Sequence, residues 1–192
     1  MAHESRHELY HEKQLSAMCG VHALNNLLQG PYFGAGDLAE VAHHLDAEEH
    51  ALLGGPSGLA SHRVDLLTGD FNIEVLAAAL QRHGVELINA DHAAVAERVS
   101  TAPQDEEAFL LHMSAHWLTL RKLGGMWWNI DSRLERPRLV PHDALLPALA
   151  RHRADGQAVF VVQPGAGSDG RRHSLPPPLR RADSNSVGQE EV

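Results

Sequence analysis

The chain has 192 residues, of which 43% are hydrophobic and 21% charged, enough apolar material for one domain with a sizeable core. Its net charge of −9 with neutral histidines disfavours nucleic acid as a partner. The polar N-terminus does not resemble a signal peptide, and no run approaches the roughly 18 apolar residues that a membrane helix needs. A single cysteine excludes an internal disulfide, which fits a reducing compartment, so we expect a protein of the cytoplasm or nucleus. Because the sequence shows no membrane segment, we expect no membrane partner. A monomer is the default expectation.

Apolar residues at helical spacing dominate the first half of the chain. They predict a helix that begins at Cys19 and is stopped by Gly30-Pro31, and a second over 36–46 with a short continuation that ends in the glycine pair at 54–55. A third helix is predicted over 73–83, before Gly84. Residues 54–70 are rich in turn-forming residues, and we assign no element to them.

From residue 85 onward, short runs of aliphatic and aromatic residues predict strands. These runs are VELIN, AFLLHM, HWLTLRKL, MWWNIDS and AVFVV, at 85–89, 108–113, 116–123, 126–132 and 158–162. A helix over 142–156 separates the last two. Helices followed mainly by strands joined in hairpins indicate an α+β fold. We expect a disordered, histidine-rich lead-in over 1–8, one domain over 9–163 and a disordered tail over 164–192.

Two overlapping H-E-x-x-H patterns, at residues 3–7 and 7–11, have the spelling of a zinc-hydrolase helix. Such a site needs a stable helix and a third ligand from elsewhere. Here the motif would begin at His3, on a polar terminus with little to hold it. We therefore expect no metal site and keep a zinc hydrolase only as an alternative hypothesis.

The stretch GAGSDG at 165–170 matches the glycine fingerprint of dinucleotide-binding folds. That fingerprint requires a following helix whose N-terminus holds the phosphate, and the three prolines of RRHSLPPPLRR at 171–181 forbid one. We therefore expect no nucleotide cofactor. The basic, proline-rich stretch at 171–181 has two possible roles, as a nuclear-import signal or as a ligand of a domain that binds proline-rich peptides.

Cys19 lies where irregular chain becomes helix. A thiol at this position meets the positive end of the helix dipole and unbonded backbone N–H groups, and both favour the nucleophilic thiolate. Alternatively, a cysteine at the start of a helix can be a small hydrophobic residue that packs in the core and has no catalytic role. Catalysis would require a histidine as base and an acceptor that orients the histidine.

Hairpin geometry selects His116 as that base. If Gly124-Gly125 forms a two-residue turn, Leu123 pairs with Met126 and the register of both strands is fixed. Because side chains alternate along a strand, His116 and Asp131 then share a face as diagonal neighbours, roughly 7–8 Å apart at Cα. An ordinary surface His–Asp pair is the alternative, but the order cysteine, histidine, aspartate favours a catalytic site.

Two blocks, YHEKQLSAMCGVHALNNLLQGPYF (10–33) and HWLTLRKLGGMWWNIDS (116–132), closely resemble the Josephin domain, the papain-like catalytic module of ataxin-type deubiquitinases. The similarity extends over 9–163 and is poorest across 48–68 and 89–107. It implies a papain-like α+β fold in which N-terminal helices, with a projecting helical hairpin, pack on an antiparallel sheet.

The resemblance also implies hydrolysis at the C-terminal glycine of ubiquitin, with ubiquitin or ubiquitinated proteins as partners and no cofactor. By position, Cys19 matches the nucleophile and His116 the general base. Asp131 falls where the family has its orienting residue, which is asparagine in the best-known member. Gln14 matches the glutamine that donates to the oxyanion, a role that a neutral amide can fill.

Two further residues are candidates for contact with the ubiquitin tail. Trp117, beside the base, could wall a narrow channel, and His22 lies one turn past Cys19. A structural role remains open for both. The resemblance places the projecting hairpin at 31–55. A non-catalytic ubiquitin-binding adaptor with the same fold is the alternative function.

Overall fold

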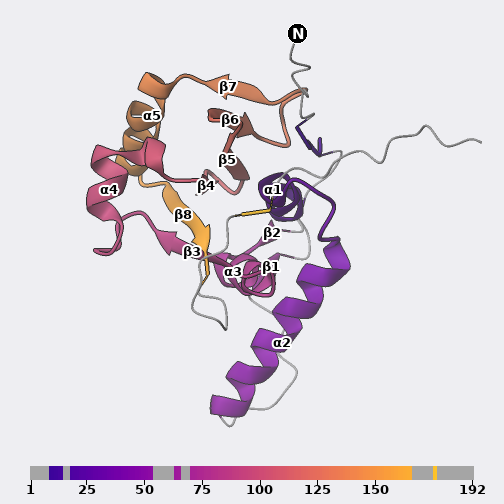
Figure 1. The fold of residues 1–192 in the computed structure, drawn as a ribbon. Helices are drawn as coiled ribbons and strands as arrows, with labels where there is room; N and C mark the ends of the chain where they lie inside the picture. Colours follow the sequence, from indigo (N-terminus) through magenta and orange to yellow (C-terminus); the bar gives the residue numbers. More distant parts are fainter. Residues whose placement is uncertain (1–8, 15–17, 54–62, 66–69, 166–174, 177–192) are drawn as a thin grey trace, which may run out of the picture.

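The computed structural model describes residues 9–14, 18–53, 63–65, 70–165 and 175–176. Its helices are α1 (Cys19–Leu28), α2 (Ala35–Leu53), α3 (Ile73–Gln81), α4 (Ala96–Thr101) and α5 (His142–Ala154), with a 3₁₀ turn, η1, at Pro103–Asp105. Its strands are β1 (Val64–Asp65), β2 (Asp70–Phe71), β3 (Val85–Asn89), β4 (Ala108–His112), β5 (Trp117–Leu123), β6 (Met126–Ile130), β7 (Arg138–Val140) and β8 (Ala158–Pro164). The predicted α+β class is confirmed (Figure 1).

Within the described residues, six strands form one antiparallel sheet in the order β3-β8-β4-β5-β6-β7, and β1 and β2 form a separate pair. Strand β8 inserts between β3 and β4, although it comes last in the chain. In the β5–β6 hairpin Leu123 pairs with Met126, as predicted. Both turn glycines, 124 and 125, have positive φ angles (58° and 76°), which suits a two-residue hairpin turn.

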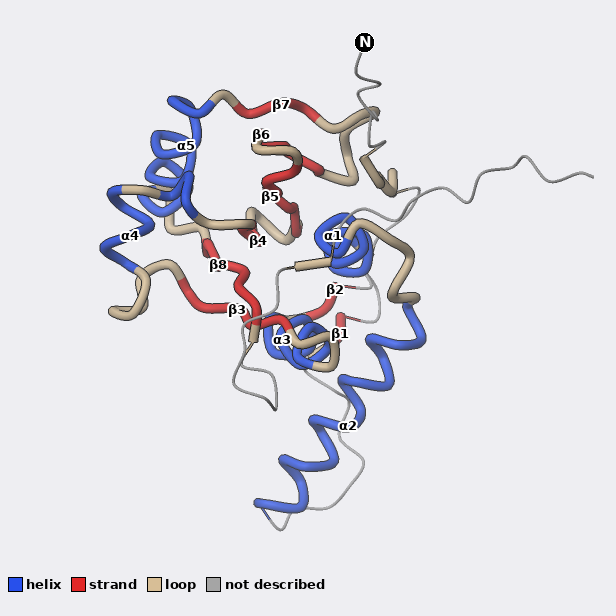
Figure 2. Tube along the Cα trace, viewed as in Figure 1, coloured by secondary structure: helices blue, strands red, loops and turns tan. Residues whose placement is uncertain are grey.

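Helices cover both faces of the sheet. Figure 2 shows α1 and α3 on one side and α4 and α5 on the other. On β4, Phe109 and Leu111 point into the cluster shared with α4 and α5, whereas Leu110 points toward α1 and α3. Strands buried on both faces consist of nearly continuous apolar residues, which explains the runs at 108–111 and 158–162.

Helix α2 projects from the body of the molecule as one helix of 19 residues (Figure 1). Arg63 holds it to the body, because the guanidinium pairs with Asp46 and Glu49 of α2 and with Glu74 of α3. The projecting hairpin was expected over 31–55, and the described residues of that range form the single helix α2 instead of two helical arms. None of the described helices combines the length and apolarity needed to cross a membrane.

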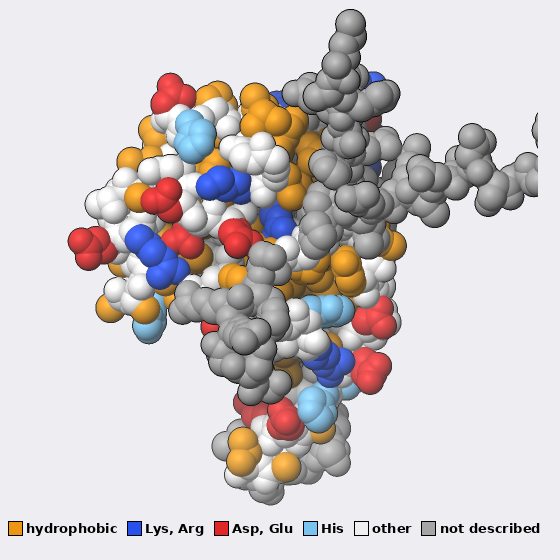
Figure 3. Space-filling view, viewed as in Figure 1, with side chains coloured by type: hydrophobic (Ala, Val, Ile, Leu, Met, Phe, Trp, Pro, Cys, Tyr) orange, Lys and Arg blue, Asp and Glu red, His pale blue; other side chains and the backbone are white. Residues whose placement is uncertain are grey.

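The surface carries charges of both signs. Figure 3 shows acidic, basic and histidine side chains interspersed over the described part of the face in view. The short elements α4, η1 and β7 were not predicted from the sequence, because each spans six residues or fewer and shows little periodicity.

Leu175 departs from the expectation of a disordered tail over 164–192. It is only 4% exposed and lies in the core cluster shared with α1 and α3 (Figure 1, yellow piece beside α1). Its N–H donates to Glu107 Oε2 (3.2 Å), and the carbonyl of Pro176 accepts from Arg121 (2.9 Å). Burial lowers the pKa of Arg121 to about 10, although the charge of Glu107 opposes that change. Leu175 and Pro176 therefore pack as part of the domain.

Replacing the buried leucine tests this anchor. Leu175→Ala should lower the free energy of unfolding by about 2–4 kcal/mol, because it removes buried methyl groups and leaves a cavity. Urea denaturation followed by circular dichroism measures the change. Leu52→Ala, at a leucine that is 86% exposed, is the matched control and should change little. Equal unfolding midpoints for both variants would contradict the anchor.

Candidate active site

His116 and Asp131 meet at the open end of the β5–β6 hairpin. His116 directly precedes β5 and Asp131 directly follows β6. The ladder ends at the pair Thr119–Ile130, and beyond it the imidazole Nε2 lies 2.7 Å from Asp131 Oδ1. The diagonal proximity expected from the register is therefore present as a hydrogen bond.

A strained turn sets the position of His116. Met113 and His116 exchange both backbone hydrogen bonds (2.8 and 2.9 Å) around Ser114 and Ala115, whose φ angles are 46° and 59°. This is the geometry of a type I′ hairpin turn, which usually contains asparagine or glycine. Left-handed backbone costs roughly 1–2 kcal/mol for a residue with a Cβ. The turn was not predicted, because neither residue carries its usual signal.

Backbone donors fix the Asp131 carboxylate. Its Oδ1 also accepts from the N–H of Arg133 at 2.9 Å, and its carbonyl accepts from the N–H of Leu134 at 3.0 Å. The ring of His11 adds a contact at 3.0 Å from Nε2 to the Asp131 carbonyl. The loop therefore presents the carboxylate to His116 in a single orientation.

Cys19 opens α1 and is buried beneath the same turn. Its Sγ lies 4.0 Å from the carbonyl oxygen of Ala115, the residue before His116. Helix α1 is held against β5 by the hydroxyl of Thr119, which donates to the Ala23 carbonyl at 2.8 Å. Asp131 occupies Nε2 of His116, so Nδ1 is the ring nitrogen that remains for the sulfur.

The site favours a positively charged imidazole. Burial alone would lower the pKa of His116, but the hydrogen bond with Asp131, the interaction with Cys19 and the charge of Asp131 outweigh burial and raise this pKa to about 9. Burial alone would likewise raise the pKa of Asp131. Hydrogen bonds from His116 and from the N–H of Arg133, together with their charges, instead hold it below its ordinary value. An imidazolium beside a sulfur stabilises a thiolate.

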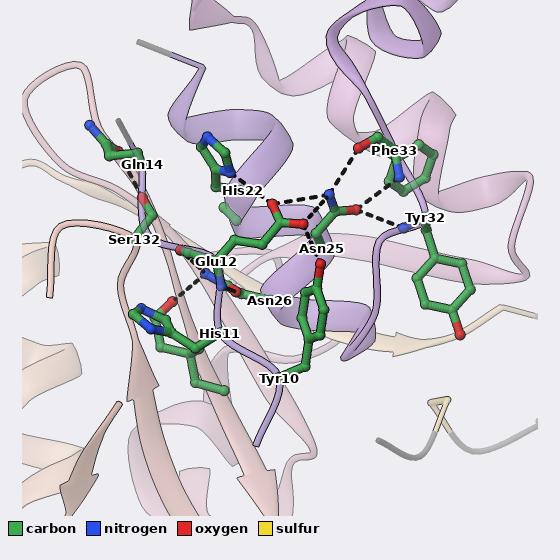
Figure 4. Close-up of polar contacts among 12 residues, drawn as sticks. Tyr10, His11, Glu12, Gln14, His22, Asn25, Asn26, Tyr32, Phe33 and Ser132 are labelled. Atoms are coloured by element: carbon green, nitrogen blue, oxygen red, sulfur yellow. Dashed lines mark hydrogen bonds and ion pairs between the residues drawn. The ribbon is translucent and has the colours of Figure 1, made fainter. Parts of the chain in front are cut away.

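Gln14 lies against the loop that carries Asp131. Its backbone N–H donates to the carbonyl of Ser132 (2.9 Å), and the Ser132 hydroxyl donates to Gln14 Oε1 (2.7 Å). Figure 4 shows the amide nitrogen of Gln14 directed away from Ser132. Residues 15–17, which connect Gln14 to the start of α1, lie outside the described part. Its role at an oxyanion stays a prediction.

His22 bonds to Glu12 instead of the thiol. Its Nδ1 lies 2.7 Å from Glu12 Oε2, and the same carboxylate accepts from the Asn25 amide (3.0 Å) and the Tyr10 hydroxyl (Figure 4). Burial, with the hydrogen bond and charge of Glu12, raises the pKa of Tyr10 above its ordinary value. His22 thus helps to attach the N-terminal segment to α1, and its contact with ubiquitin stays a prediction.

Trp117 is a core side chain in this structure. It is 2% exposed, its indole N–H donates to the Phe71 carbonyl (3.1 Å), and its ring stacks on His112 with centroids 4.2 Å apart. A Cβ added to Gly20 would lie 3.6 Å from Trp117 Cδ1, so α1 approaches the indole closely. The predicted channel wall is therefore not exposed here, and that role stays a prediction.

The H-E-x-x-H patterns and the glycine stretch at 165–170 fall largely outside the described residues. Of the histidines and glutamates that define the H-E-x-x-H patterns, only His11 is among the described residues, and it contacts the Asp131 carbonyl. The described residues contain no group of three or more histidine, cysteine or acidic side chains arranged for a metal. Of the glycine stretch at 165–170 only Gly165 is described, and its N–H donates to the Gly84 carbonyl at 2.7 Å.

Titration of His116 tests the ion pair with Asp131. Its pKa should be about 9 by NMR, so the stabilisation from the pair is complete below the ordinary value of 6.5 and is lost as pH rises through about 9. Asp131→Asn should lower that pKa, because burial then acts without the opposing charge. Asp143→Asn, at an exposed position, should leave it unchanged. An unshifted His116 pKa in Asp131→Asn would contradict the pairing.

Comparison with known proteins places the chain in a family. The sequence model of the Josephin family matches residues 14–163. The chain is 36% identical to human ataxin-3 over 165 residues and 35% identical to the human ataxin-3-like protein over 164. It is 38% identical to the ataxin-3 homolog of Arabidopsis thaliana over 166 residues.

Each of these alignments covers 81% of the chain but only 45%, 46% and 59% of the respective relative, so the chain spans about half the length of the relatives it matches. The resemblance noted in the sequence is confirmed, and the mixed architecture agrees with a papain-like α+β fold. The chain belongs to the Josephin family.

Proposed function

We propose that the chain is a thiol-dependent deubiquitinase that hydrolyses isopeptide or peptide bonds at the C-terminal glycine of ubiquitin. One observation carries the proposal: the 2.7 Å bond between His116 and Asp131, with the Cys19 sulfur 4.0 Å from the carbonyl oxygen of Ala115, the residue before His116. Family membership supports the substrate class. Ubiquitin and ubiquitinated proteins are the partners that follow.

Acylation uses the two ring nitrogens of His116 differently. Before substrate binds, Nδ1 already holds the proton that came from Cys19, and the thiolate attacks the carbonyl carbon of the terminal glycine. Gln14 and the backbone N–H of Cys19 donate to the oxyanion. The tetrahedral intermediate collapses when the C–N bond breaks, and the imidazolium protonates the departing lysine amine. Asp131 holds Nε2 throughout and stabilises the charged ring.

Deacylation reverses these roles. His116 takes a proton from water, the hydroxide attacks the thioester carbonyl, and the C–S bond breaks to release the ubiquitin carboxylate. The protonated ring and the released Cys19 thiolate restore the ion pair with which the cycle began. No step requires a metal, and Nδ1 of His116 takes up or gives up the proton in each transfer.

A non-catalytic ubiquitin-binding adaptor is the second candidate, because Cys19 is only 5% exposed and Trp117 lies buried next to His116. Both candidates predict binding of ubiquitin. They differ in whether the sulfur forms a bond to ubiquitin's terminal glycine.

A ubiquitin probe with an electrophilic C-terminus separates the candidates. The wild-type chain should form a covalent adduct that Cys19→Ala abolishes and a chelator does not affect. Hydrolysis of a ubiquitin-derived fluorogenic substrate should fall by at least about 10³-fold in Cys19→Ala and in His116→Ala. His142→Ala, at an exposed histidine, is the matched control. Ubiquitin binding without any adduct would favour the adaptor, and loss of activity with chelator would favour the zinc hydrolase.

A further inference from the structure

We propose that Ser132 is a positioning residue that turns the side-chain amide of Gln14 toward the oxyanion. This inference rests on the proposed function. Ser132 directly follows Asp131, so one short loop would serve both the base and the oxyanion donor. Sequence reasoning did not single out Ser132, because its partner Gln14 is 118 residues away in the chain.

Two hydrogen bonds clamp Gln14 to Ser132. The backbone bond (2.9 Å) fixes the main chain of Gln14, and the hydroxyl bond (2.7 Å) fixes its side-chain carbonyl. Ser132 is 1% exposed, so water competes little for this hydroxyl. A buried hydroxyl with one acceptor within reach is a well-defined donor.

The orientation of the amide matters because its two ends have opposite chemistry. The oxygen and nitrogen of glutamine have nearly the same shape, and only the nitrogen can donate to a developing negative charge. A hydroxyl donor on Oε1 directs Nε2 to the opposite side, as Figure 4 shows. Among the described residues no acceptor engages Nε2 of Gln14, so its N–H groups remain for a ligand.

Hydrogen bonds between the preceding residues and helix α1 hold Gln14 in place for this interaction. The N–H of Glu12 donates to the buried Asn26 of α1 at 2.7 Å. Asn26 also donates to the Ile130 carbonyl at 3.2 Å, just before the Asp131 loop. Asn26 therefore ties α1, the N-terminal segment and the end of β6 together, and the Ser132 hydroxyl completes the arrangement at Gln14.

Removing the hydroxyl should impair the acyl-transfer step and leave the thiolate intact. Ser132→Ala should lower kcat for a ubiquitin-derived fluorogenic substrate by about 10–100-fold with KM little changed, because one oxyanion donor is worth about 10²–10³ in kcat. Alkylation of Cys19 by iodoacetamide needs no oxyanion donor, so its rate should stay within about twofold of wild type. The same Ser132→Ala change in a Gln14→Ala background should have no further effect on kcat.

Three results would overturn the inference: an unchanged kcat in Ser132→Ala, an equal fall in the alkylation rate, or a full additional loss in the Gln14→Ala background. The second result would mean that Ser132 acts through Asp131 and His116 instead. If Ser132→Ala does not fold, Ser132→Thr and Ser132→Val are matched in shape, and only threonine should retain kcat. Absence of Cys19-dependent turnover in the wild-type chain would instead reject the proposed function itself.

Discussion

The hydrogen bond between His116 and Asp131 depends on the register of one hairpin. A shift of the β5–β6 pairing by one residue would send the two side chains to opposite faces. The Gly124-Gly125 turn fixes that register at one end, and the strained Ser114-Ala115 turn sets the start of β5 at the other. Strain at a site of chemistry persists only when the surrounding structure determines it. Here the flanking strands β4 and β6 supply that constraint.

Three separate parts of the chain contribute to the site. Helix α1 brings Cys19, the hairpin brings His116 and Asp131, and the N-terminal segment brings Gln14. Each junction between them is a hydrogen bond rather than an apolar contact alone: Thr119 joins β5 to α1, and Asn26 joins α1 to β6. Directional bonds of this kind orient the side chains, whereas burial in the core supplies most of the stability.

Local signals explain what the sequence predicted well. Asn72 caps the start of helix α3 with a side chain that accepts from the Val75 N–H, and the helix ends at Gln81, shortly before Gly84, where it was expected to end. The long apolar runs became strands, and the glycine turn gave the β5–β6 register. Non-local contacts explain what it missed. The insertion of β8 between β3 and β4, the burial of Leu175 and the clamp between Ser132 and Gln14 join residues far apart in the chain, and periodicity carries no information about them.

The central claim is that Asp131 acts through His116, and a double-mutant cycle on kcat/KM tests it most directly. Asp131→Ala, His116→Ala and the combined variant are compared with wild type on one fluorogenic ubiquitin substrate. A carboxylate whose only task is to hold and charge the imidazole has no effect once the imidazole is gone. Asp131→Ala should therefore lower kcat/KM in the wild-type chain and cause no further loss in the His116→Ala chain. Independent, additive losses would contradict it.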